Sequence, residues 1–140
     1  MKDATPAELQ DMEVLASSDS YVLQYSPALS LGRLEFTKRP TGVEYQAAIS
    51  HFCDQVLKRG FRLMLFNNLK AGFISQEEKV WSRFYIENLL PKSALRRMAS
   101  VTGGNLIQRM IISDMHHQGR HPYQLDCFSS EREALAWLLA

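Results

Sequence analysis

Residues 65–81, LFNNLKAGFISQEEKVW, contain the signals from which the fold is derived. The stretch begins in an apolar run, residues 62–66, which is too short for a helix and is typical of a strand buried on both faces. Two asparagines end the run, a loop follows, and Ser75 stands three residues before Glu78. In this Ser-x-x-Glu capping box the hydroxyl accepts from an early helical N–H and the glutamate reaches back to the cap. The stretch therefore predicts a strand, a loop, and a helix that begins at Ser75.

The same capping box occurs three more times, at Thr5, Thr41 and Ser130. Thr5 is followed by a proline at the first helical position, where its missing N–H costs nothing, and this predicts an N-terminal helix to about Leu15. After Thr41, apolar residues recur at helical spacing, and Gly60 ends the segment as a C-terminal cap. Ser130 begins a closing helix. Capping boxes thus predict helices along most of the chain.

The remaining segments predict strands and one further helix. Residues 21–26 and 32–39 are strand-like runs separated by a turn, and they predict an antiparallel hairpin. Residues 96–104 and 123–128 predict two more strands, and a helix is expected from Asn105 between them. Helices and strands alternate after the hairpin, which favours a largely parallel sheet with right-handed crossovers.

The prediction is an α/β domain with a mixed, mostly parallel five-stranded sheet and about four helices. An extra N-terminal helix and linker are assigned to residues 1–19, and the domain itself to residues 20–140.

Composition excludes several classes of protein. The chain has 140 residues, of which 46% are hydrophobic and 10% aromatic, as in one globular domain. The formal charge of +1 provides no bulk attraction to phosphate backbones, so no nucleic-acid partner is expected. No run approaches the ~20 apolar residues of a membrane-spanning helix. Residues 1–12 lack the apolar core of a signal peptide, so none is expected. The two cysteines, Cys53 and Cys127, are expected to be reduced, mostly buried thiols of a cytoplasmic protein.

Two parts of the sequence resemble the STAS-like superfamily, which contains sulfate-transporter domains and anti-sigma-factor antagonists. Its members follow the third strand with an Asp-Asn-Arg-Lys-like turn, a Gly-x-Ile-Ser step, acidic residues and a tryptophan, and they end in Glu-Ala-Leu-x-Trp-Leu. The matching residues here are Asn67, Asn68, Lys70, Gly72, Ile74, Ser75, Glu77 and Trp81, and in the tail Glu133, Ala134, Leu135, Trp137 and Leu138. The resemblance spans about residues 21–140. It implies a SpoIIAA-like fold and a stand-alone bacterial module of uncertain role.

Two positions depart from the pattern of these relatives. Asn67 stands where an acidic residue is expected, and Leu69 stands where an arginine is expected. In the anti-sigma-factor antagonists a kinase phosphorylates a serine directly after the third strand, in an Asp-Ser-Ser/Thr-Gly-like sequence. This chain lacks that sequence, and Ser75 comes several residues later. Ser75 is therefore interpreted as a helix cap that contributes ~1 kcal/mol, in preference to a phosphorylation switch.

Other candidate sites have simpler interpretations. His116, His117 and His121 lie in one turn, but the first two point to different faces and no carboxylate or cysteine pair completes a set, so no metal is expected. Gly103 and Gly104 precede a helix without the spacing of a nucleotide-binding loop, and they predict a strand-to-helix turn. The densest basic group is interpreted as a solvated loop face; it consists of Lys92, Arg96 and Arg97.

Two functional hypotheses follow. The first is a non-enzymatic regulatory or protein-interaction module, as the resemblance implies. Its working surface is expected to be the loop of residues 67–75 and the helix after it, and the expected surface residues are Asn67, Asn68, Lys70, Gly72, Phe73 and Ser75. The alternative is a carrier of a small apolar molecule or lipid, with a pocket lined by Trp81, Phe84 and Tyr85. An enzyme is not expected, because the sequence offers no activated nucleophile, metal set or paired acid and base, and no cofactor is expected. The protein partner, and whether the chain forms a homodimer, are left open.

Overall fold

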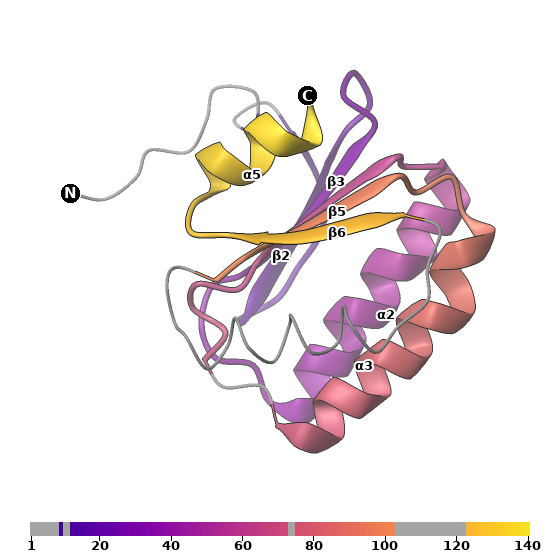
Figure 1. The fold of residues 1–140 in the computed structure, drawn as a ribbon. Coiled ribbons are helices and arrows are strands. Elements are labelled where there is room, and N and C mark those ends of the chain that lie inside the picture. The colour runs from indigo at the N-terminus through magenta and orange to yellow at the C-terminus, as the bar shows by residue number, and fades with distance from the viewer. Residues whose placement is uncertain (1–8, 10–11, 73–74, 103–122) are drawn as a thin grey trace.

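The computed structural model describes residues 9, 12–72, 75–102 and 123–140 of the chain (Figure 1). Its elements follow in chain order: β1 (Glu13–Ser17), β2 (Tyr21–Ser26), β3 (Leu31–Phe36), α2 (Gly42–Arg59), β4 (Leu63–Asn67), α3 (Gln76–Leu89), a short 3-10 helix η1 (Leu90–Lys92), β5 (Arg97–Val101), β6 (Gln124–Phe128) and α5 (Glu131–Leu138).

The six strands form one sheet in the order β1-β2-β3-β4-β5-β6, which is also their order along the chain. β1 pairs antiparallel with β2, and β2 pairs antiparallel with β3. From β3 to β6 all neighbours are parallel. The predicted hairpin and the mixed, mostly parallel sheet are therefore confirmed.

The predicted count of five strands was wrong, because the N-terminal helix does not extend to Leu15. Residues Glu13–Ser17 form β1 instead, with Glu13 opposite Tyr25 and an irregularity in the pairing between Val14 and Ala16. Pairing with β2 supplies backbone hydrogen bonds across the sheet, and this tertiary contact overrides the local helical signal. Most of the predicted N-terminal helix lies outside the described residues, and the domain boundary at residue 19 stays a prediction.

The helices begin where the capping residues predict. Thr41 caps α2 with a complete capping box, since Glu44 N–H donates to Thr41 Oγ1 and Thr41 N–H donates to the Glu44 carboxylate. Gly60 ends α2 in the left-handed region, at φ 68°, with its N–H donated to the Val56 carbonyl. Three α-helices lie in the described part of the chain; the helix predicted from Asn105 lies outside it.

The sheet is covered on both faces (Figure 1). α2 and α3 lie on one face and α5 on the other. The face under α2 and α3 carries the larger core, which includes the predicted stripe of α2, formed by Tyr45, Ile49, Phe52 and Val56. The face under α5 carries a smaller apolar cluster, whose buried residues are Leu9, Met12, Leu31, Leu65, Ala99, Val101, Ala134, Leu135 and Leu138.

Gly32 permits the close approach of α2 to β3. A Cβ at this position would lie 2.7 Å from the Phe52 ring and 2.8 Å from the Phe61 ring, closer than van der Waals contact allows. Both rings belong to the larger core. The absence of a side chain at residue 32 is therefore a packing requirement and sets the spacing between the helix layer and the sheet.

Candidate functional site

The loop after β4 forms a tight turn that is held by its two asparagines. Asn67 is the last residue of β4, and its Oδ1 accepts from the Leu69 backbone N–H at 3.1 Å. Asn68 donates its backbone N–H to the Val101 carbonyl of β5 at 2.9 Å, and its own carbonyl accepts from the Ala71 N–H at 3.1 Å. Asn67, Asn68 and Ala71 are buried, whereas Leu69 and Lys70 are exposed. The turn therefore presents a leucine and a lysine to solvent from a fixed base.

Gly72 follows this turn in the left-handed region, at φ 75°. A Cβ at Gly72 would also lie 3.3 Å from Cδ of Arg39, whose side chain packs against it. Conformation and space both favour glycine here. Phe73, which the sequence placed on the same surface, lies outside the described residues.

Ser75 is the N-cap of α3, as predicted. Its hydroxyl accepts from the Glu78 backbone N–H at 3.2 Å. The Glu78 side chain reaches towards the first turn of α2, because a Cβ on Gly42 would lie 2.8 Å from its Oε1. A carboxylate at this place faces the positive end of the α2 dipole. Ser75 is exposed, and its modification state stays a prediction.

The three rings proposed as a pocket lining have different surroundings. Trp81 and Tyr85 stack with centroids 5.1 Å apart and an interplanar angle of 22°, and both pack partly buried against the larger core. Phe84 is 71% exposed. The stacked pair thus contributes to the core, and Phe84 projects away from it.

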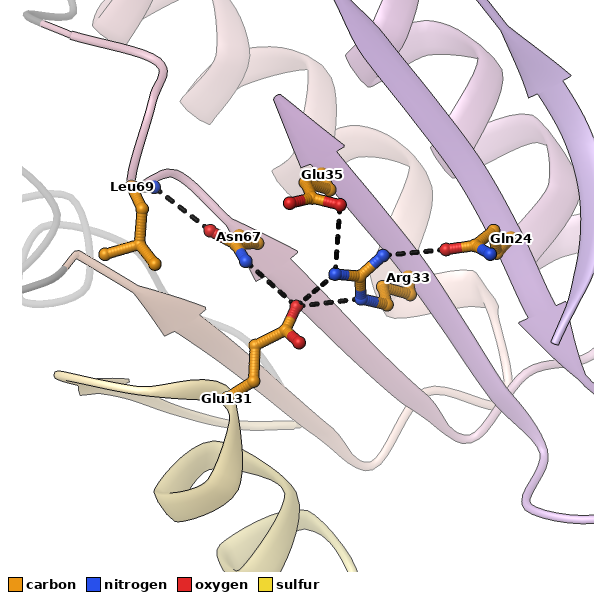
Figure 2. Close-up of polar contacts among 6 residues, drawn as sticks. All are labelled: Gln24, Arg33, Glu35, Asn67, Leu69 and Glu131. Carbon is orange, nitrogen blue, oxygen red and sulfur yellow. Dashed lines mark hydrogen bonds and ion pairs between the residues drawn. The ribbon is translucent and has the colours of Figure 1, made fainter. Parts of the chain in front are cut away.

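A buried polar network on the α5 face connects four elements (Figure 2). Its centre is Oε1 of Glu131, the first residue of α5, which accepts from Arg33 Nε at 2.8 Å, from Arg33 Nη2 at 2.5 Å and from Asn67 Nδ2 at 2.9 Å. Arg33 also donates Nη1 to Gln24 Oε1 at 2.7 Å and Nη2 to Glu35 Oε1 at 3.1 Å. The network therefore joins β2, β3, β4 and α5 through side chains alone.

Burial determines how much this network contributes. The side chains of Arg33 and Glu131 are only 7% and 9% exposed, whereas Glu35 is 28% exposed. Removing one partner of a buried, hydrogen-bonded ion pair costs about 3–5 kcal/mol, because the other charge is left uncompensated. The pair thus holds α5 on the sheet in one defined position.

The network also gives a physical reason for the neutral residue at position 67. An aspartate has no N–H to donate, so at this position its carboxylate would face the carboxylate of Glu131. The amide of Asn67 instead donates to Glu131 and accepts from Leu69. An asparagine in place of the acidic residue that the resemblance implied thus fits the surroundings of position 67.

Arg33 and Glu131 were not predicted as site residues, although the sequence of β3 contains a signal for Arg33. Side chains alternate between the two faces of β3. Leu31, Arg33 and Glu35 lie on one face, while Leu34 and Phe36 point to the larger core on the other. A charged residue next to the apolar Leu31 on one face of a buried strand needs a partner, and that signal identifies Arg33. It does not identify Glu131, which is 98 residues away.

The prediction that Lys92, Arg96 and Arg97 form a solvated loop face is wrong for one of the three residues. Lys92 and Arg96 are exposed, as expected. Arg97 is not part of a solvated loop face. It lies in β5, donates Nε to Gln124 Oε1 at 3.0 Å and Nη1 to the Trp137 carbonyl at 2.5 Å, and lies over the Trp137 ring. Arg97 therefore anchors the C-terminal end of α5.

Cys53 and Cys127 are reduced and not joined by a disulfide, as predicted. Cys53 is fully buried between α2 and the sheet, and burial raises the pKa of its thiol to about 12. Cys127 is half-buried. Burial also raises the pKa of the neighbouring core residue Tyr45 to about 12, against a smaller opposite effect of the Ser82 hydroxyl.

Across the described residues, no three His, Cys, Asp or Glu side chains gather as metal ligands would. His116, His117, His121, Gly103 and Gly104 lie outside the described residues. In the same described ranges, no helix combines the length and apolar character that crossing a membrane requires.

Comparison with known proteins gives the fold. No protein-family model and no curated protein matches the chain. The crystal structure of an uncharacterised protein of the DUF3478 family from Shewanella loihica PV-4, described as having a SpoIIAA-like fold, is similar with a TM-score of 0.56 and 17% sequence identity. The similarity covers 91% of each chain. The fold is therefore SpoIIAA-like, as the resemblance of the sequence to the STAS-like superfamily implied.

Proposed function

We propose that this protein is a non-enzymatic, cytoplasmic interaction module of STAS type, and that it binds a protein partner through the turn after β4. The observation that carries the proposal is the contrast within this turn. Its base, Asn67, Asn68 and Ala71, is buried and hydrogen-bonded, while Leu69 is 50% exposed beside the exposed Lys70.

The physical support for the proposal is preorganisation. A large apolar side chain held at the tip of a fixed turn loses little conformational entropy on binding, so more of its contact energy appears as affinity. Loops on a rigid scaffold are also where binding residues are concentrated. The SpoIIAA-like fold agrees with such a role, but a fold alone does not assign one. Leu69 beside Lys70 suits a partner surface with an apolar pocket bordered by a carboxylate.

The chain supplies a matched control for this proposal. Leu57 and Lys58 are also an exposed leucine–lysine pair, but they lie near the C-terminal end of α2. The test compares wild type, Leu69→Ser/Lys70→Glu and Leu57→Ser/Lys58→Glu as tagged full-length baits in a lysate of the source organism. Quantitative mass spectrometry should find a protein that wild type and the Leu57/Lys58 variant capture equally and the Leu69/Lys70 variant loses. Equal capture by all three baits would refute the assignment of the surface.

The carrier hypothesis stays a prediction, and a separate measurement on untagged protein tests it. Native mass spectrometry of untagged protein, beside a denatured sample, would show mass lost on denaturation if a ligand is carried. Mass that survives denaturation would show covalent modification, including phosphate on Ser75. The stacked pair of Trp81 and Tyr85 packs against the core and Phe84 projects away from it, so the three rings do not face one common space.

A further inference from the structure

The side chain of Asn67 bonds to two separate parts of the protein (Figure 2). Its Oδ1 accepts from the Leu69 N–H of the exposed turn, and its Nδ2 donates to Glu131 Oε1 in the first turn of α5. The two atoms belong to one planar amide, so a rotation that breaks one bond also misaligns the other. The turn and the start of α5 therefore share one rigid group.

Neither bond is readily replaced by water. Asn67 is only 5% exposed. If Glu131 withdraws, Nδ2 loses its acceptor in a buried place, which carries the desolvation cost of an unpaired donor. The same movement takes the acceptor from Nε of Arg33 and leaves Nη2 with Glu35 alone. The position of Asn67 is thus fixed by the position of α5.

We propose that Asn67 couples the Leu69–Lys70 turn to α5, so that partner binding at the turn and displacement of the first turn of α5 influence each other. The inference rests on the proposed function and adds its regulation. A partner whose acceptor takes over the hydrogen bond from the Leu69 N–H leaves Oδ1 of Asn67 without that donor. The Asn67 amide can then rotate, which weakens its bond to Glu131. Such coupling is reciprocal, so an event that lifts Glu131 off the sheet alters partner affinity by the same factor.

The other end of α5 provides a control for general loosening of the helix. Arg97 holds this end through the carbonyls of Trp137 and Ala140, at 2.5 and 3.1 Å. This contact involves neither Asn67 nor Glu131. Two perturbations can therefore loosen the same helix, one through Asn67 and one independently of it.

The test is amide hydrogen exchange in the full chain, measured by NMR without any partner. Arg33→Met/Glu131→Leu replaces the ion pair by apolar side chains, an exchange that is often neutral for folding, and it leaves Asn67 Nδ2 without its acceptor in α5. Exchange of the Leu69 amide should accelerate at least about fivefold. Arg97→Met should leave it unchanged. The Asn68 amide, bonded to Val101, should be unchanged in both variants and reports that the sheet is intact.

An unchanged Leu69 amide in the double variant would overturn the coupling, and so would equal acceleration in Arg97→Met. If the circular dichroism spectrum shows that the double variant does not fold, the Asn67→Asp variant is measured in its place. Its carboxylate still accepts from Leu69 but cannot donate to Glu131, so the effect is read at α5. The Ala134 amide, bonded to the Ser130 carbonyl, should then exchange about fivefold faster. No acceleration there would overturn the proposal.

The outcome is separable from that of the proposed function. Exchange rates need no partner, so a failure of the Leu69/Lys70 capture experiment removes the proposed surface and leaves a measured coupling in place. Unchanged exchange rates remove the coupling and leave partner capture unaffected.

Discussion

The two faces of the sheet are held by different means. Under α2 and α3 the contacts are apolar and aromatic, as in the pair of Phe52 and Phe66, whose ring centroids are 5.0 Å apart. Under α5 a smaller apolar cluster is joined by directed contacts, with Glu131 at one end of the helix and Arg97 at the other. Stability on the first face is spread over many atoms. On the second face it is concentrated in a few.

The largest expected effect lies on the α2/α3 face. Phe52→Ala removes a fully buried ring that packs on Phe66 and against Gly32. The lost burial and the cavity together should lower the free energy of unfolding by about 3–5 kcal/mol. Urea denaturation followed by circular dichroism measures this. A loss below about 1 kcal/mol would show that the helix layer collapses into the gap, contrary to a tightly packed face.

On the α5 face we expect a comparable loss of unfolding free energy, which a second substitution should recover. Glu131→Ala leaves the buried Arg33 without its main partner and should cost about 3 kcal/mol. Arg33→Met/Glu131→Leu should recover most of this, because both charges are removed together. Urea denaturation of the two variants measures the difference. If the double variant is as unstable as Glu131→Ala, the contribution of Glu131 is not that of an ion pair.

Alkaline pH should weaken the α2/α3 face in particular. The pKa of Cys53 is raised by burial from 9.0 to about 12 in the folded state, so the thiol's contribution is complete below pH 9 and is lost as pH rises towards 12. Between pH 8 and pH 10 the free energy of unfolding should fall by roughly 1–2 kcal/mol from this group. Denaturation curves at the two pH values measure the fall. Cys53→Ala should reduce it, whereas Cys127→Ala should not.

The smallest effects compare two equivalent helix caps, one on each face. Ser75 accepts from Glu78 N–H at 3.2 Å, and Ser130 accepts from Glu133 N–H at 3.3 Å. Ser75→Ala should cost about 1 kcal/mol. Ser130→Ala should cost more, because Ser130 directly precedes Glu131 and fixes the entry of the chain into the network. Thermal denaturation of both variants tests the order, and equal losses would show that the cap does not position Glu131.

Local signals were sufficient to predict most helix boundaries and the parallel part of the sheet. The caps at Thr41, Ser75 and Ser130 and the glycine at residue 60 act within a few residues of themselves, so the sequence displays them directly. β1 was missed because its state depends on pairing with β2, and local preference pointed to a helix.

The candidate site was predictable only in part. The strand, the loop after it and the cap at Ser75 were predicted and are confirmed, whereas the use of this loop as an interaction surface stays a prediction. The role of Asn67 depends on Glu131, which is 64 residues away. No periodicity or spacing in a sequence connects residues at such a distance, so the contact between the loop and α5 could be found only from the three-dimensional structure.

The separation of Arg33 from Glu131 has a consequence for synthesis on the ribosome. The two residues are 98 positions apart, so at translation rates of about 5–20 residues per second the carboxylate emerges roughly 5–20 s after the guanidinium. The strands, in contrast, are ordered in the sheet as they are ordered along the chain, so each can join an existing neighbour as it appears. In the nascent sheet Arg33 therefore lacks its main acidic partner for several seconds, until Glu131 emerges and α5 can pack on the sheet.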